Sequence, residues 1–110
     1  MKIRLLADVI AYGVTYPKGS VQTVCRKPTS TGSTRFAITG RRGHKLNWDQ
    51  YVVVQIKLNC TIGLRGCEEL TEGAVFTPTY SYQSDPEIGE HVELKGGRVV
   101  FIDRTDFDYV

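Results

Sequence analysis

The sequence lacks any apolar run long enough to cross a membrane, and it has few of the residues that build small secreted scaffolds. Of its 110 residues, three are cysteines, four are prolines and one is tryptophan. No stretch approaches the roughly 18 apolar residues that a transmembrane helix needs. Asp8 interrupts the apolar start before a signal-peptide core can form. We therefore expect one folded, cytoplasmic chain that does not enter a membrane.

The three cysteines offer neither a disulfide framework nor a metal site of familiar spacing. An odd number does not fit a secreted disulfide scaffold, although Cys60 and Cys67 are close enough in sequence to bond across a loop in an oxidant. Structural zinc sites use cysteine pairs two to four residues apart. Cys25 is isolated, and no such pair exists. We expect free thiols, no metal and no other cofactor.

Catalytic motifs are missing as well. No glycine-rich phosphate loop lies between a strand and a helix. His44 falls in a hairpin turn and His91 lies between acidic neighbours, and neither is near a recognisable nucleophile. The sequence therefore predicts a protein that is not an enzyme.

The pattern of apolar residues has a period of two. Lys2–Ile10 and Tyr51–Asn59 alternate and read as half-buried strands. Gly96-Gly97 between Val92–Leu94 and Val99–Ile102 predicts a hairpin, because both glycines can take positive φ. Polar, turn-rich segments at residues 27–34 and 84–89 predict loops. We expect an all-β fold with no long helix.

The chain also contains an internal repeat. At an offset of 56, Leu46 aligns with Ile102, Asn47 with Asp103 and Tyr51 with Phe107. Asn47 and Asp103 can each cap one helical turn before the last strand of a unit. Upstream, residues 13–16 align with residues 73–76 at an offset of 60, which predicts a loop four residues shorter in the second copy.

This layout resembles the SH3-like small β-barrel, in which a one-turn 3₁₀ helix precedes the last strand. Residues 70–76, 92–94 and 107–110 resemble small SH3-like proteins of bacteriophages. The resemblance implies two tandem SH3-like small β-barrels with short 3₁₀ turns, one over residues 1–58 and one over residues 59–110. It also implies a viral protein acting in the host-cell cytoplasm, but no shared active site.

The net charge of +2 hides two halves of opposite sign. Residues 1–66 carry eleven basic and two acidic residues, a balance of +9, and residues 67–110 carry three basic and ten acidic residues, a balance of −7. The candidate basic binding patch comprises Arg26, Lys27, Arg35, Arg41, Arg42 and Lys45. The candidate acidic binding patch comprises Glu68, Glu69, Glu72, Asp85, Glu87, Glu90, Glu93, Asp103, Asp106 and Asp108.

Three functions fit these patches. The first is a non-enzymatic inhibitor that engages a host protein, such as a defence or nucleic-acid enzyme, in a host–virus protein–protein interaction. The second is a nucleic-acid-binding barrel whose basic loops track a phosphate backbone beside Phe36 and Trp48. If both aromatics are instead core residues, the basic charges are only a solvated face. The third is a structural virion or connector component, for which complementary charges favour a homo-oligomer.

Overall fold

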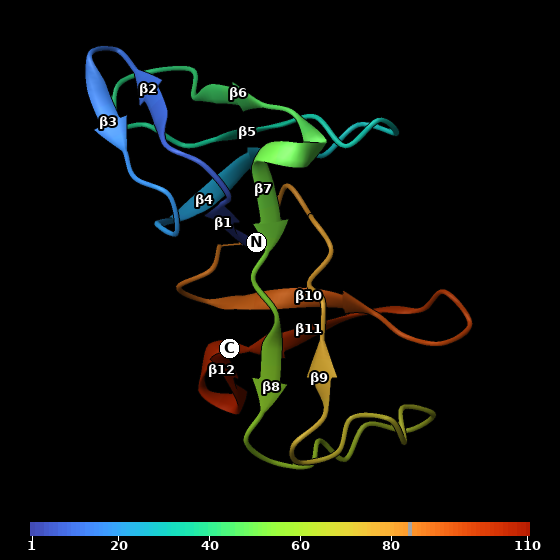
Figure 1. The fold of residues 1–110 in the computed structure, drawn as a ribbon. Coiled ribbons are helices and arrows are strands. Elements are labelled where there is room, and N and C mark those ends of the chain that lie inside the picture. The colour runs from blue at the N-terminus through green and yellow to red at the C-terminus, as the bar shows by residue number, and fades with distance from the viewer. Residues whose placement is uncertain (84) are drawn as a thin grey trace. The chain divides into compact units, whose positions relative to one another are not determined.

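The computed structural model describes residues 1–83 and 85–110, and the elements it assigns there are strands and two single-turn 3₁₀ helices (Figure 1). The sheets curl in the manner of a small β-barrel, so the all-β prediction without a long helix is confirmed for the described residues. The first unit contains β1 (Lys2–Leu5), β2 (Val9–Ala11), β3 (Val14–Tyr16), β4 (Val21–Arg26), β5 (Thr34–Phe36), β6 (His44–Leu46), η1 (Trp48–Gln50) and β7 (Tyr51–Val53). The second contains β8 (Ile56–Leu58), β9 (Val75–Phe76), β10 (Gly89–Glu93), β11 (Val99–Asp103), η2 (Arg104–Asp106) and β12 (Phe107–Tyr109).

The chain divides into two compact units, which we call the basic unit (Lys2–Val53) and the acidic unit (Met1 with Val54–Val110). The boundary differs from the expected one after residue 58, because β8 pairs with β12 and β9 and so belongs to the acidic unit. The basic unit carries nine basic and two acidic side chains, a balance of +7. The acidic unit carries five and ten, a balance of −5.

Two long strands expected from the alternation are each broken in the structure. Lys2–Ile10 divides into β1 and β2, and Tyr51–Asn59 divides into β7 and β8. The hydrogen bond from the amide of Leu6 to the carbonyl of Gln50 (2.9 Å) still follows the register of β1 with β7, and beyond it the chain enters the separate β2–β3 hairpin. An alternating pattern identifies buried positions but does not reveal where the strand changes partner.

The basic unit is built on a five-stranded antiparallel sheet in the order β6-β5-β4-β1-β7, with a separate β2–β3 hairpin. Its core contains Ile3, Leu5, Val24, Phe36 and Leu46, each at most 5% exposed. On β5, the side chains of Thr34 and Phe36 are buried, so the alternation directs Arg35 to the outer face of the sheet.

The acidic unit repeats this strand order. β12-β8-β9 form one sheet, β10-β11 form another, and a bridge between Thr79 and His91 continues the order from the end of β9 to β10. The offset of 56 is confirmed in the second half of each unit, where η1 and β7 correspond to η2 and β12. The predicted hairpin at Gly96-Gly97 is also confirmed, with φ of 96° and 89°.

The predicted alignment of residues 13–16 with residues 73–76, at an offset of 60, is wrong. Gly19 and Gly73 are the equivalent glycines, because their amides donate to the carbonyls of Leu5 and Leu58, each at 2.8 Å. The correct offset there is 54, so the following segment is two residues longer in the second copy. Gly13 and Gly19 both have positive φ, 74° and 85°, and only their hydrogen-bond partners distinguish them.

Candidate functional site: a row of cations on the basic unit

Three cations of the predicted basic patch lie side by side across the sheet of the basic unit. Arg26 of β4 is paired in register with Arg35 of β5, and Arg35 is paired with Lys45 of β6. Directly opposed residues of antiparallel strands present their side chains on one face, with Cβ atoms about 5 Å apart. Since Arg35 faces outward, the three form a row on the outer face. We call Arg26, Arg35 and Lys45 the cation row.

A β-bulge produces this alignment. The register shifts between Val24, which opposes Phe36, and Arg26, which opposes Arg35. In a regular ladder Cys25 would oppose Arg35, and Arg26 would oppose the buried Thr34. The extra residue therefore turns Arg26 onto the outer face, which is the way bulges re-aim side chains. The hydroxyl of Thr34 donates to the carbonyl of Arg26 (2.6 Å) beside the bulge.

The cation row lacks ion pairs among the described residues. Among residues 1–83 and 85–110, none of its three cations forms an ion pair with a carboxylate, and Arg35 donates only to the carbonyl of Gly43 (3.2 Å). Like charges directly opposed across a sheet are destabilising. Cations that are kept together without carboxylates favour binding of an anion at their side chains.

The cation row lines a pocket of about 240 Å³ together with Thr29, Ser33 and Thr34. The polar loop predicted at residues 27–34 supplies these hydroxyls, of which that of Thr34 already donates to Arg26, so those of Thr29 and Ser33 are the candidate donors to a ligand. It is closed on itself, since the amide of Thr29 donates to the carbonyl of Ser33 (2.9 Å) and their hydroxyl oxygens lie 2.9 Å apart. Cationic groups and hydroxyl donors together are the groups that bind a phosphate oxygen. The role of these hydroxyls is not predicted by the sequence patterns above, although a loop rich in serine and threonine between two arginines indicates it.

Trp48 lies against the same loop and is 70% exposed. Gly32, with φ of 83°, lies so close that a Cβ there would be 2.7 Å from the Cβ of Trp48. The hydroxyl of Tyr51 donates to the carbonyl of Gly32 (2.6 Å) and fixes this part of the loop. Phe36 is fully buried, so the alternative that both aromatics are core residues is correct for Phe36 and wrong for Trp48.

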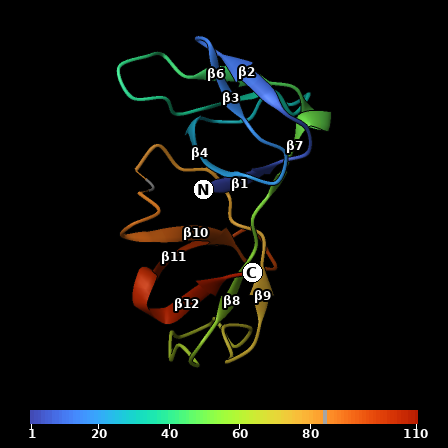
Figure 2. The ribbon, with the colours of Figure 1, turned by 60° about the vertical axis from the view of Figure 1, so that its left-hand side comes forward.

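The other three predicted basic residues lie outside the pocket. Lys27, Arg41 and Arg42 are exposed, and none of them lines it. The guanidinium of Arg41 lies 4.6 Å from the ring centroid of Tyr12, at the tip of the β2–β3 hairpin, which runs beside β6 (Figure 2). The structure thus brings together half of the predicted basic patch.

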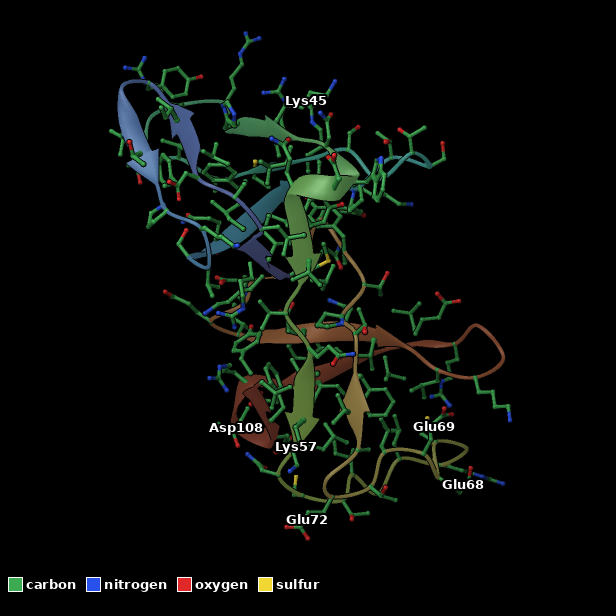
Figure 3. All side chains as sticks on the ribbon, viewed as in Figure 1. Lys45, Lys57, Glu68, Glu69, Glu72 and Asp108 are labelled. Carbon is green, nitrogen blue, oxygen red and sulfur yellow. The ribbon has the colours of Figure 1, made fainter. Side chains whose placement is uncertain are left out.

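The predicted acidic patch is more dispersed. Glu68, Glu69 and Glu72 lie on the loop between β8 and β9, and Asp108 lies on β12, opposite Lys57 of β8 (Figure 3). The remaining exposed or half-buried members come from other loops and strand ends of the acidic unit: Asp85, Glu87, Glu93, Asp103 and Asp106.

Some of these carboxylates have local structural roles. Asp103 caps η2 by accepting from the amide of Thr105 (3.0 Å), and this hydrogen bond lowers the pKa of Asp103. Glu69 accepts from the amide of Lys95 (3.1 Å). A carboxylate that caps a turn or closes a loop contributes to the fold whether or not a partner is bound.

Glu90 does not belong to the surface, because it is fully buried. Its Oε2 accepts from the hydroxyl of Tyr109 (2.9 Å), and its Oε1 lies 2.9 Å from the amino nitrogen of Met1. Burial, with the charge of Glu90, raises the pKa of Tyr109 well above its usual value. Position 90 follows the start of β10, where two successive residues are buried and the alternation fails.

All three cysteines are free, so no disulfide joins Cys60 to Cys67. Cys60 donates to Asp106 Oδ1 (3.6 Å), and burial, followed by the charge of Asp106, raises its pKa. No group of three or more metal-binding side chains occurs in the described part of the chain. Within the same residues, no helix is long and apolar enough to cross a membrane.

No protein-family profile, curated protein or solved structure matches the chain. The fold defines an all-β protein of small-barrel type, and the cation row is its best-formed candidate site. The likeness to bacteriophage proteins stays a prediction.

Proposed function

We propose that the chain is a non-enzymatic binding protein whose basic unit binds the phosphate backbone of a nucleic acid at the cation row. The observation that carries this proposal is the alignment of Arg26, Arg35 and Lys45 around one pocket that also offers hydroxyl donors. Arginine, lysine, serine and threonine are the side chains that most often contact phosphate and sugar.

The size and charge of the site favour a phosphate on a longer chain. A pocket of about 240 Å³ is below the roughly 300–1,000 Å³ of ordinary small-molecule sites. A phosphate-sized group fits that space, and affinity then comes from further contacts along the backbone. The balance of +7 on the basic unit attracts a polyanion, and the balance of −5 on the acidic unit repels it. Binding is therefore confined to the basic unit.

The opposite charges of the two units support a second candidate, in which a host protein is engaged. Charge complementarity steers protein association and selects partners. This host-directed inhibitor and the virion component remain predictions. Affinity capture from a bacterial lysate, with and without nuclease, tests the host-directed inhibitor: a protein recovered after nuclease treatment supports a protein partner, and recovery that requires nucleic acid contradicts one.

Binding of a fluorescein-labelled oligonucleotide at low salt, followed by anisotropy, tests the main proposal. The double variant Arg26→Gln/Lys45→Gln removes two cations from the row, and Arg4→Gln/Lys18→Gln removes two from elsewhere in the same unit. A hydrogen bond to a charged group contributes about 1.5–3 kcal/mol, so the loss of even one such bond should lower the affinity of the row variant at least about tenfold. The control variant should lose much less. Equal losses, or no binding by the wild type, would contradict the proposal.

A further inference from the structure

The side chain of Trp48 lies against the turn that lines the pocket of the cation row, and it is largely exposed. Trp48 begins η1, three residues after Lys45, and is 70% exposed. Its Cβ packs against Gly32, and the next residue, Ser33, lines the pocket. A large aromatic ring on the surface carries contact area that the fold does not use.

We infer that the ligand of the basic unit is a single-stranded nucleic acid, with one phosphate in the pocket and a neighbouring base stacked on Trp48. This inference rests on the proposed function and adds the strand form and the residue that selects it. The bases of a duplex are stacked on one another and do not offer their faces to a side chain. Single strands offer them, and an exposed aromatic beside a cationic groove is the usual arrangement for their recognition.

The position of the loop supports this division of roles. Gly32 meets Trp48, while Thr29 and Ser33 of the same turn face the pocket. The bond from the hydroxyl of Tyr51 to the carbonyl of Gly32 (2.6 Å) keeps both contacts in place without a ligand. A preformed arrangement of this kind reduces the entropy lost on binding.

An exposed aromatic ring does not by itself define a base-stacking site, and Tyr82 is an exposed aromatic with which Trp48 can be compared. It is 86% exposed in the acidic unit, where the negative balance opposes a phosphate backbone. Tyr82→Ala is therefore a matched control for Trp48→Ala, since each removes one exposed aromatic ring.

Trp48 is the only tryptophan of the chain, so intrinsic fluorescence reports on this ring alone. Three probes of equal length, about 8 nucleotides, separate the contributions: oligothymidylate, a strand without bases and a duplex. Oligothymidylate should quench the fluorescence, and the strand without bases should bind through its phosphates with little quenching. The duplex should bind more weakly than oligothymidylate.

Trp48→Ala should weaken oligothymidylate binding about 5- to 150-fold, which corresponds to ~1–3 kcal/mol for one stacked base. It should leave the strand without bases unaffected, Trp48→Phe should recover part of the loss, and Tyr82→Ala should change nothing. The inference is overturned if oligothymidylate does not quench the fluorescence of Trp48, or if Trp48→Ala weakens binding of both strands equally. It is also overturned if the duplex binds as tightly as oligothymidylate. In those cases a loss in Arg26→Gln/Lys45→Gln still supports the proposed function, whereas absence of binding by all three probes removes both.

Discussion

Replacing Lys45 by glutamine should stabilise the free protein at low salt, even though it removes a candidate binding residue. Lys45 lies directly opposite Arg35, with Arg26 on the far side of Arg35. No carboxylate of the described residues pairs with Lys45. The substitution therefore relieves repulsion without breaking an ion pair. A site arranged for an anion is expected to lower the stability of the protein without its ligand.

The size of the effect follows from the exposure of the row. Directly opposed cross-strand pairs change stability by about 0.2–1 kcal/mol. Lys45 is exposed, so solvent screening places the gain near the lower end, at ~0.2–0.5 kcal/mol. For a domain of this size the melting temperature should rise by about 1–4 °C. The gain should disappear near 1 M salt, where the Debye length is about 3 Å.

Thermal and urea unfolding, followed by circular dichroism at low and high salt, measure this effect. The matched control is Lys57→Gln, because Lys57 lies opposite Asp108 on β12 (Figure 3). It loses an attractive pair and should be destabilised slightly at low salt. The reasoning is refuted if Lys45→Gln destabilises the protein at low salt, or if its effect is independent of salt.

Three further predictions concern other parts of the molecule. Burial raises the pKa of Tyr109 above its usual 10.0, so the unfolded chain loses the phenol proton at a lower pH than the folded protein does. The free energy of unfolding should therefore fall as the pH rises above about 10. In Tyr109→Phe, the urea midpoint should fall less over the same pH range. Gly43→Ala should destabilise the protein more than Gly19→Ala in urea unfolding. Both glycines have positive φ, but only at Gly43 would a Cβ lie 2.6 Å from Phe36 O and 2.7 Å from Cys25 Sγ. Equal losses of stability in the two variants would contradict this. Iodoacetamide should modify the exposed Cys25 first, Cys60 more slowly because burial raises its pKa, and the buried Cys67 only after unfolding; mass spectrometry gives the order, and early modification of Cys67 would contradict the burial.

The parts of the fold that depend on local patterns could be predicted from the sequence. Asn47 and Asp103 precede η1 and η2 as expected, because a helical turn followed by a closing strand is encoded within about ten residues. The position of β8 could not be predicted, since alternation does not show which strand will be the partner.

The candidate site was predictable only in part, for a related reason. The sequence identifies the cations but not the bulge at residues 24–26 that places Arg26 opposite Arg35. It also suggests that Glu90 is a surface residue, because no local pattern indicates that the hydroxyl of Tyr109 will reach it in the core. Both features depend on residues that are distant in sequence and meet only in the folded unit.

The salt dependence of oligonucleotide affinity tests the central claim most directly. For single strands, the logarithm of the affinity falls with the logarithm of the salt concentration with a slope of about −0.7 for each phosphate that is neutralised. Because the pocket holds one phosphate, Arg26→Gln/Lys45→Gln should make this slope shallower by about 0.7, and Arg4→Gln/Lys18→Gln should leave it nearly unchanged. A slope that is the same in the wild type and the row variant would contradict the assignment of Arg26, Arg35 and Lys45 as the phosphate site.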